Sequence, residues 1–173
     1  TETIVQLIAK SKRTKMIDKV VDTLFQVQGG YALVMMSNKK LIGARDPLGI
    51  RPLVLGKLKN SYVFASETCA FDIIGAKFIR EIENGEVVVI EEGNLKSIKP
   101  FTKKKARPCV FEYVYFSRPD SYLKGKCAYE YRKNFGYELA KESDDLGDIV
   151  VPVPDSGVPA AIGYSQLKNK SFE

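Results

Sequence analysis

The sequence contains no histidine and no tryptophan among its 173 residues, and it has only three cysteines. Without histidine, this chain cannot supply Ser-His-Asp or Cys-His catalysis, nor the imidazole ligands of most zinc sites. Its cysteines, Cys69, Cys109 and Cys127, show no C-x-x-C spacing, and their odd number favours reduced thiols. The composition therefore excludes histidine-dependent catalysis by this chain and argues against a disulfide-stabilised fold.

Long apolar runs are also missing, and no segment approaches the length of a membrane span. The sequence shows no signal-peptide pattern, so we expect a cytoplasmic protein with no membrane partner. The formal net charge is +6, but the lysines are spread along the chain and their one compact run is Lys103–Lys105. Three adjacent lysines are typical of a solvated loop, so no nucleic acid partner is expected.

What the sequence does contain is the composition of a globular protein, with 45% hydrophobic and 28% charged residues. Apolar residues at helical spacing predict helices over residues 3–10, 15–25 and 67–74. Extended apolar segments separated by turn residues predict strands over residues 31–36, 40–45, 51–55, 62–66, 86–90 and 95–98. This order predicts an α+β domain in which helices precede an antiparallel β-meander.

A lysine-rich segment over residues 101–108 is predicted to be a linker. After it we expect an aromatic strand over 110–116, a helix over 127–142 and a buried strand over 148–151. Strands that alternate with helices are typical of a parallel α/β sheet. The candidates for the buried side of the helix over 127–142 are Tyr131, Phe135, Leu139 and Ala140.

The last predicted strand leads into a loop, Pro154-Asp155-Ser156-Gly157, and then into a helix that starts near Val158. A helix N-terminus presents free backbone N–H groups and the positive end of the helix dipole, which suit a phosphate or a carboxylate. The loop is therefore a candidate anion site. The structural alternative is that Ser156 only caps the helix.

Three further candidates each have a structural explanation. Thr1 could act as an N-terminal nucleophile, but its place before a helical pattern favours a capping role. Asp46 and Arg51 could pair across the turn between two predicted strands, where turn geometry alone accounts for Asp, Pro and Gly. Cys109 is most simply a buried, small apolar residue.

Five segments, taken in order, carry a resemblance to a known family. They read RDPLGIRPL at residues 45–53, ASETCA at 65–70, ENGEVV at 83–88, CVFEYVYFSRPDS at 109–121 and VPVPDSG at 151–157. Together they closely resemble the amidophosphoribosyltransferases, the glutamine-dependent enzymes that open de novo purine synthesis. The first segment is shared loosely with asparagine synthetase-type amidotransferases, whereas the aromatic segment with its Arg-Pro-Asp-Ser turn is more specific. The resemblance covers essentially the whole chain.

The resemblance implies two domains. Residues 1–100 would be the distal part of an N-terminal-nucleophile glutaminase domain of the αββα type, which releases ammonia from glutamine. Residues 101–108 would be the linker. Residues 109–173 would begin a type I phosphoribosyltransferase domain with a Rossmann-like fold, in which ammonia displaces pyrophosphate from phosphoribosyl pyrophosphate. The product would be 5-phosphoribosylamine.

The family's nucleophilic cysteine would precede Thr1, and its Asp-Asp ribose-binding motif would follow Glu173. The chain is therefore expected to be an internal fragment that contains no catalytic residue and is inactive alone. Hydrolysis of glutamine by this polypeptide would contradict that expectation.

On the same resemblance, Asp155, Ser156, Gly157 and Val158 would form the pyrophosphate loop, and Ser156 would lie at a magnesium position. Cys109 matches an iron–sulfur ligand of the family branch that carries a [4Fe-4S] cluster, although the branch without a cluster can also have cysteine there. The full-length enzyme would be a homo-oligomer that uses glutamine and phosphoribosyl pyrophosphate.

Two alternatives remain open at this point. An asparagine synthetase-type amidotransferase would share the glutaminase part, but it would lead into a domain whose loop is richer in Ser and Gly than residues 154–157. A non-catalytic basic binding module would bind nucleic acid with a steep dependence on salt.

Overall fold

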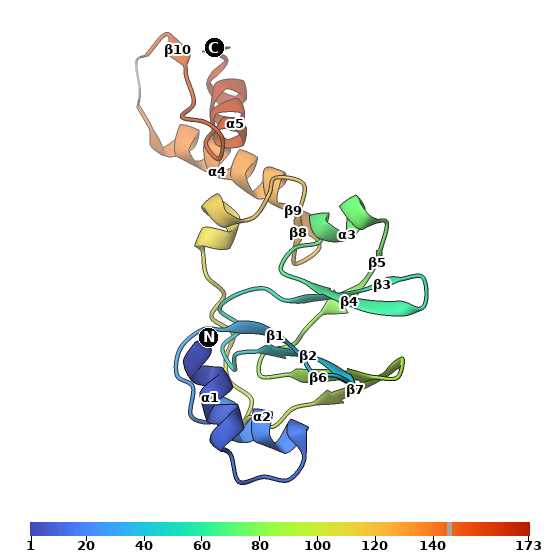
Figure 1. Ribbon diagram of the computed structural model, residues 1–173. Coiled ribbons are helices and arrows are strands. Elements are labelled where there is room, and N and C mark those ends of the chain that lie inside the picture. Colours follow the sequence, from blue (N-terminus) through green and yellow to red (C-terminus); the bar gives the residue numbers. More distant parts are fainter. Residues whose placement is uncertain (145–146) are drawn as a thin grey trace. The chain divides into compact units, whose positions relative to one another are not determined.

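The computed structural model describes residues 1–144 and 147–173, which divide into two compact units (Figure 1). Unit 1 comprises residues 1–66 and 79–108. Unit 2 comprises residues 67–78 and 109–173, so it includes a short segment that lies in sequence between two stretches of unit 1. No helix in the described ranges is both long and apolar enough to cross a bilayer.

Unit 1 contains two helices and two antiparallel sheets. The helices, α1 (Glu2–Lys10) and α2 (Met16–Leu24), lie close to their predicted ranges. One sheet has the order β1-β2-β6-β7, with strands Ala32–Met36, Lys40–Arg45, Val87–Glu91 and Asn94–Ile98. The other has the order β4-β3-β5, with strands Ser61–Ala65, Val54–Leu58 and Lys77–Glu81, the last of which begins within the 67–78 segment.

The prediction of antiparallel strands is confirmed, but the prediction of a single meander is wrong. Strand β2 pairs with β6, in a register that sets Ile42 opposite Val89, and not with the strand that follows it in sequence. Strand β5 is not predicted by the sequence pattern, because its residues KFIRE mix charged and apolar side chains. Pairing between strands so distant in sequence is selected by shared burial, which local patterns do not encode.

The β1-β2-β6-β7 sheet is buried on both faces. Val87 and Val89 pack with Val20 and Leu24 of helix α2, whereas Val88 packs with Leu55 of the second sheet. Figure 1 shows α1 and α2 on one side of this sheet and β3 and β4 on the other. Burial on two faces explains why β6 is a continuous apolar run and not an alternating one.

A buried carboxylate organises the turn before β6. Glu86 is only 1% exposed, and Arg80 donates to both of its carboxylate oxygens at 2.6 and 2.8 Å. The Ser97 hydroxyl and the Glu83 N–H donate to the same group at 2.6 and 2.7 Å. Burial alone would raise the pKa of Glu86, but these hydrogen bonds and the Arg80 charge lower it below its usual range.

Unit 2 is mainly helical. Its helices are α3 (Cys69–Ile74), a π-helical turn η1 (Glu112–Phe116), α4 (Ala128–Glu142) and α5 (Val158–Lys168). Strands β8 (Tyr122–Leu123) and β9 (Lys126–Cys127) form an antiparallel pair. Strands β10 (Ile149–Val150) and β11 (Ser171–Phe172) form a parallel pair on either side of α5, as expected of a βαβ unit.

The predicted aromatic strand over 110–116 is wrong, because these residues form the η1 turn. The buried Arg132 guanidinium donates to the carbonyls of Tyr113 and Ser117 at 2.9 and 2.6 Å, and so holds both ends of the turn. The Tyr113 ring also packs edge-on against Tyr131, with ring centroids 5.0 Å apart. These tertiary contacts override the strand propensity of the aromatic residues.

Helix α4 occupies its predicted range, but its predicted buried face is confirmed only at Ala140 and in part at the half-buried Tyr131, and it is wrong at Phe135 and Leu139. The buried residues recur every fourth position, at Ala128, Arg132, Gly136 and Ala140. Phe135 and Leu139 are 41% and 56% exposed. The reason is the close approach of α5 at the middle of this face, which leaves no room for a side chain at Gly136: a Cβ there would lie 1.8 Å from the Ala160 carbonyl oxygen.

The strand predicted over 148–151 is present as β10, but it is not buried. Ile149 and Val151 are 56% and 64% exposed. Strand β10 pairs with β11 over only two residues on each strand. The described part of this sheet is therefore too small to bury the side chains of Ile149 and Val151.

We expect Glu86→Gln to lower the stability of the chain by about 2 kcal/mol at neutral pH, because a buried charged partner of Arg80 is lost. The lowered pKa of Glu86 stabilises the folded state above the unfolded pKa of about 4.3, and this contribution is lost as the pH falls through the folded value. Stability measured by urea unfolding should therefore decline less steeply in acid for the variant. Glu83→Gln, an exposed position with the same charge change, is the control.

Gly136→Ala should destabilise the chain by about 3 kcal/mol, because the new methyl group would force α4 and α5 apart. Asn134→Ala, at an exposed position of α4, should change stability by less than about 0.5 kcal/mol. Equal effects of the two substitutions in chemical unfolding would show that the helices do not pack at this distance.

Candidate functional site

The predicted loop is exposed to solvent and immediately precedes α5. Pro154 and Asp155 are joined by a cis peptide bond, and residues 154–157 form a turn. Asp155 is exposed, whereas Ser156, Gly157 and Val158 are half-buried. The structure therefore brings the four predicted residues together at a place that a ligand can reach.

Ser156 does not cap α5. The N-cap residue is Gly157, and the helix start has no side-chain cap hydrogen bond. A proline follows within the first turn, as the sequence predicts. Among the described residues, the backbone N–H groups of Ser156 and Gly157 have no acceptor. The loop thus has free donors at the positive end of an 11-residue helix, as an anion site requires.

Gly157 is required by the way the loop closes on itself. A Cβ at this position would lie 2.6 Å from the carbonyl oxygen of Val153. Its φ is −75°, so the requirement comes from the close approach of the backbone and not from a left-handed conformation.

The loop has the oxygen chemistry that suits magnesium. The Asp155 carboxylate and the Ser156 hydroxyl are hard oxygen groups, which Mg²⁺ prefers, usually together with phosphate oxygens and water. An exposed carboxylate beside free N–H groups would repel a bare phosphate, and a divalent cation would offset that repulsion.

Cys109 does not lie in a metal-binding cluster of the described residues. It is a half-buried free thiol, and no group of three or more Cys, Asp or Glu side chains in the described ranges could hold a metal ion. A [4Fe-4S] cluster is held by four cysteine thiolates. The described residues therefore do not form such a site.

Glu67 is a structural residue that the sequence analysis does not single out. One of its carboxylate oxygens accepts hydrogen bonds from the Arg118 N–H at 2.7 Å and the Ser121 hydroxyl at 2.8 Å. The neighbouring Thr68 hydroxyl accepts from the Tyr122 N–H at 2.8 Å. The only signal in the sequence was that ASETCA and FSRPDS both belong to the segments that carry the family resemblance.

The segment RDPLGIRPL has a structural role, as its turn residues predict. Arg45 donates to three backbone carbonyls at 2.7 to 3.2 Å, those of Gly49, Arg51 and Ile82. The buried Asp46 accepts from three backbone N–H groups, those of Tyr31, Leu48 and Ile50. Burial, reinforced by the Asp46 charge, raises the pKa of Tyr31 to about 12, so this phenol stays neutral.

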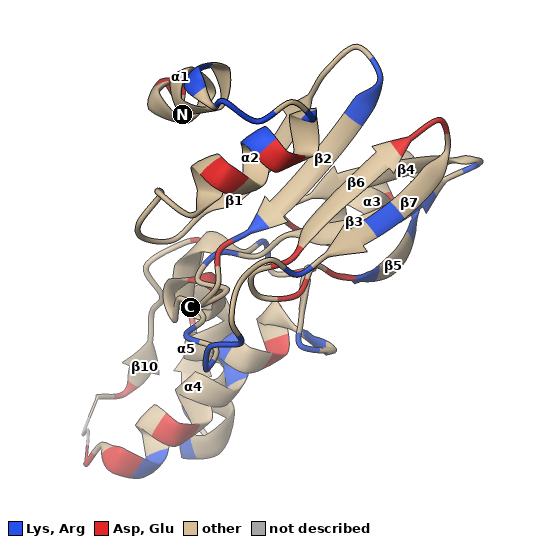
Figure 2. Ribbon diagram, turned by 90° about the horizontal axis from the view of Figure 1, so that it is seen from below, with Lys and Arg blue, Asp and Glu red and all other residues tan. Residues whose placement is uncertain are grey.

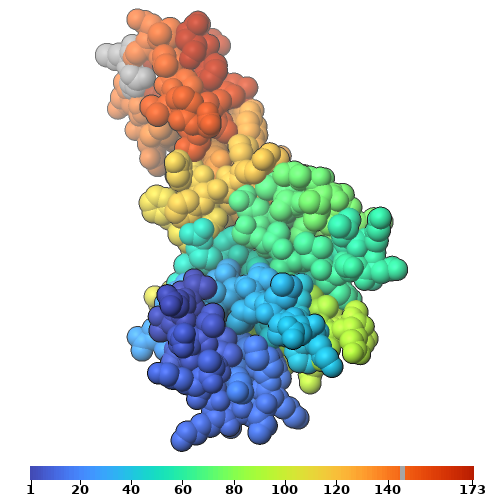
Figure 3. All heavy atoms as spheres, viewed as in Figure 1, coloured from blue at the N-terminus to red at the C-terminus, as the bar shows by residue number. Residues whose placement is uncertain are grey.

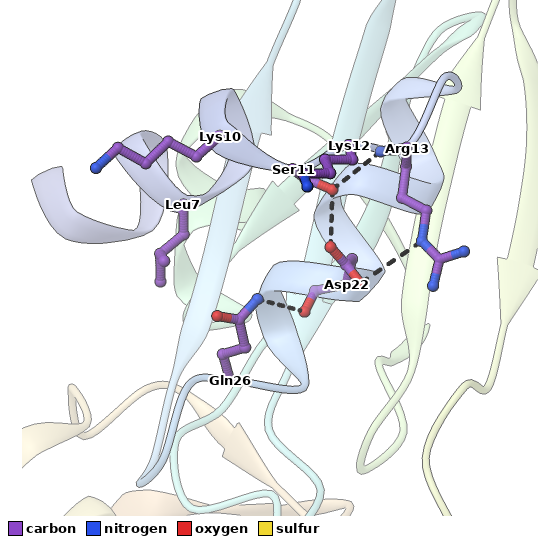
Figure 4. A pocket seen from close by; sticks show the side chains of 7 residues that line it. All are labelled: Leu7, Lys10, Ser11, Lys12, Arg13, Asp22 and Gln26. Atoms are coloured by element: carbon purple, nitrogen blue, oxygen red, sulfur yellow. Dashed lines mark hydrogen bonds and ion pairs between the residues drawn. The ribbon is translucent and has the colours of Figure 1, made fainter.

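A cavity of about 450 Å³ beside α1 and α2 does not have the arrangement of an anion site. It is lined by Leu7, Lys10, Ser11, Lys12, Arg13, Asp22 and Gln26. Figure 4 shows Ser11 and Asp22 pointing toward each other while Lys10 and Arg13 extend away on opposite sides. Ser11 and Arg13 both contact the Asp22 carboxylate, at 2.8 and 3.6 Å. This cavity therefore lies at the contact between helices α1 and α2, and polar side chains that line it pair with one another.

Charges of both signs are interspersed in the chain. Helices α2 and α4 each carry acidic and basic residues (Figure 2). Such a distribution gives no support to the alternative of a basic nucleic-acid-binding module, which needs a basic face.

Comparison with known proteins identifies the family. Residues 1–72 match the family model of the glutamine amidotransferase domain. The whole chain is 51% identical to an amidophosphoribosyltransferase of Rhizobium etli, of which it spans 36%, and 41% identical to that of Bacillus subtilis. A solved structure of the Bacillus subtilis glutamine phosphoribosylpyrophosphate amidotransferase in complex with ADP and GMP superposes with a TM-score of 0.96, covering all of this chain and 38% of that one. A relative from Glycine max, 42% identical, is named as chloroplastic.

The first part of the chain is thus a glutamine amidotransferase domain region, in a mixed α/β fold with antiparallel sheets. Over its whole length, the chain matches part of the amidophosphoribosyltransferases. It spans about a third of the length of the relatives that it matches. The match continues through residues 109–173, so it does not favour the asparagine synthetase-type alternative.

We expect Ser156→Ala to leave the stability of the chain within about 0.5 kcal/mol, since its hydroxyl does not cap α5. Gly157→Ala should lower stability by about 1–3 kcal/mol, because its Cβ would clash with the Val153 carbonyl. Thermal unfolding of both variants measures the difference. A loss of about 1 kcal/mol or more in Ser156→Ala would indicate a capping role after all.

Proposed function

We propose that this chain is part of an enzyme that transfers ammonia from glutamine to phosphoribosyl pyrophosphate and produces 5-phosphoribosylamine, the first step of purine synthesis. The observation that carries the proposal is the 51% identity to an amidophosphoribosyltransferase, which extends over both units and is not confined to the amidotransferase region. The exposed loop with free N–H donors before α5 supports the phosphoribosyl part of the reaction.

In this proposal, residues 1–100 serve glutamine hydrolysis, residues 101–108 are the connection, and residues 109–173 begin the phosphoribosyltransferase region. The parallel βαβ arrangement of β10, α5 and β11 supports the assignment of a Rossmann-like fold to this last part. Assembly of the complete enzyme as a homo-oligomer belongs to the same proposal.

The chemistry assigned to the loop is the binding of the leaving group. As the bond from the ribose carbon to pyrophosphate breaks and a bond to ammonia forms, negative charge develops on the departing oxygen. N–H groups of Ser156 and Gly157, at the positive end of α5, would stabilise that charge. Magnesium, when bound with the diphosphate, would supply further charge neutralisation, and the Ser156 hydroxyl and Asp155 carboxylate are the groups that would hold it. No step is assigned to Cys109.

The proposal predicts that the chain binds magnesium pyrophosphate and magnesium phosphoribosyl pyrophosphate at residues 155–158. Titration followed by backbone NMR should move the amide signals of this loop. Asp155→Asn and Ser156→Ala should each weaken binding about tenfold, the effect of one lost polar contact.

Replacement of Lys103, Lys104 and Lys105 by alanine is the control, because these residues are exposed and lie outside the loop. Their replacement should leave the affinity unchanged. Binding that depends on these lysines, falls steeply with salt and leaves the loop signals in place would contradict the proposal and favour a basic binding module.

A further inference from the structure

Glu67 belongs to unit 2 although it follows the last residue of β4, Ala65, by only two positions. It opens the 67–78 segment, which contains α3. In Figure 3 this segment, in green, lies against the yellow and orange residues that precede and begin α4. Two side chains of the segment make the hydrogen bonds that join them: one Glu67 carboxylate oxygen accepts from Arg118 and Ser121, and the Thr68 hydroxyl accepts from Tyr122.

The turn that Glu67 holds is itself the base of α4. Ser121 is completely buried, and its carbonyl accepts the Ala128 N–H at 2.8 Å. Two residues before, the Pro119 carbonyl accepts the Tyr129 N–H at 2.9 Å. The first N–H groups of a helix have no partner within the helix, so these bonds fix where α4 begins and in which direction it runs.

Electrostatics connect Glu67 with α4 as well. The buried Arg132 guanidinium has neutral carbonyl partners in its two hydrogen bonds, at Tyr113 and Ser117. Burial lowers the pKa of Arg132, and the negative charge of Glu67 opposes that effect. The same carboxylate thus supports both the turn and the buried cation of α4.

Helix α4 in turn fixes α5 through two reciprocal backbone contacts. A Cβ on Gly136 would overlap the Ala160 carbonyl, and a Cβ on Gly163 would lie 2.1 Å from the Lys133 carbonyl oxygen. Ala160 is three residues beyond Gly157, in the first turn of α5. Backbones packed this closely cannot slide without a clash, so a shift of α4 would move the start of α5.

We propose that Glu67 is a positioning residue for the 155–158 loop: it holds the 117–122 turn, the turn sets α4, and α4 sets the N-terminus of α5. The loop's role in binding a diphosphate rests on the proposed function above, whereas the mechanical link does not. A residue within the sequence region that resembles the glutaminase would then control the geometry of the phosphate site.

The test compares backbone amide hydrogen exchange in this chain and in Glu67→Ala. Exchange in the first half of α5 and in the 117–122 turn should become at least about tenfold faster, since roughly 1.4 kcal/mol of local stability corresponds to tenfold. Exchange in β2 and β6 of unit 1 should not change. Affinity for magnesium pyrophosphate should fall about tenfold in the same variant.

Three variants serve as controls. Glu67→Gln keeps an oxygen acceptor and should restore most of the protection of α5. Asp120→Ala removes only an exposed pair with Arg118 in the same turn and should have no effect on α5. Glu86→Gln loses stability in unit 1 and shows what general destabilisation does to α5. If Glu67→Ala does not fold, Thr68→Val takes its place, because it removes only the acceptor of the Tyr122 N–H.

Faster exchange confined to residues 117–122 would overturn the proposal, because the turn would then not transmit to α5. Equal acceleration in both units, as in Glu86→Gln, would overturn it too. If the unsubstituted chain fails to bind magnesium pyrophosphate while Glu67→Ala still loosens α5, the proposed function fails and the positioning role of Glu67 stands.

Discussion

Unit 2 depends on the close contact between the backbones of α4 and α5. Because Gly136 meets a carbonyl of α5 and Gly163 meets a carbonyl of α4, neither helix can carry a side chain at the crossing. This one constraint explains why glycine stands on the buried face of α4 at the crossing, and why the larger side chains of Phe135 and Leu139 are exposed. It also fixes the direction of α5, and with it the direction in which the free N–H groups before Val158 point.

Features encoded by local pattern could be predicted from the sequence. The apolar spacing located α1, α2 and α4 to within a few residues, and the strand–loop–helix pattern located the turn at 154–157 that precedes α5. In each case the information lies in residues that are neighbours in the chain. The family resemblance, carried by short segments in a fixed order, indicated the class of protein, whereas the composition indicated only that the chain is globular.

Features that depend on distant partners could not be predicted in this way. The segment 110–116 has the composition of a strand, and it forms a π-helical turn because Arg132, some 19 residues from Tyr113, holds its carbonyls. The acceptor role of Glu67 joins groups 51 and 54 positions apart, and no local spacing indicates such a contact. The exposure of Phe135 has the same origin, since helical periodicity marks an apolar face but does not say whether the neighbouring helix has room for it.

The boundary between sequence regions and the boundary between packed units are different in this chain. Residues 67–78 follow β4 in sequence and run into the start of β5, yet their contacts place them in unit 2. Glu67 and Thr68 accept hydrogen bonds from backbone N–H groups of a turn in which the carbonyls of Pro119 and Ser121 already accept from the first N–H groups of α4. The polypeptide therefore enters unit 2 twice, and the earlier entry provides the anchor on which the later one begins its helix. A two-domain description by residue number misses this, since the stability of the later region is partly contributed by twelve residues that precede it.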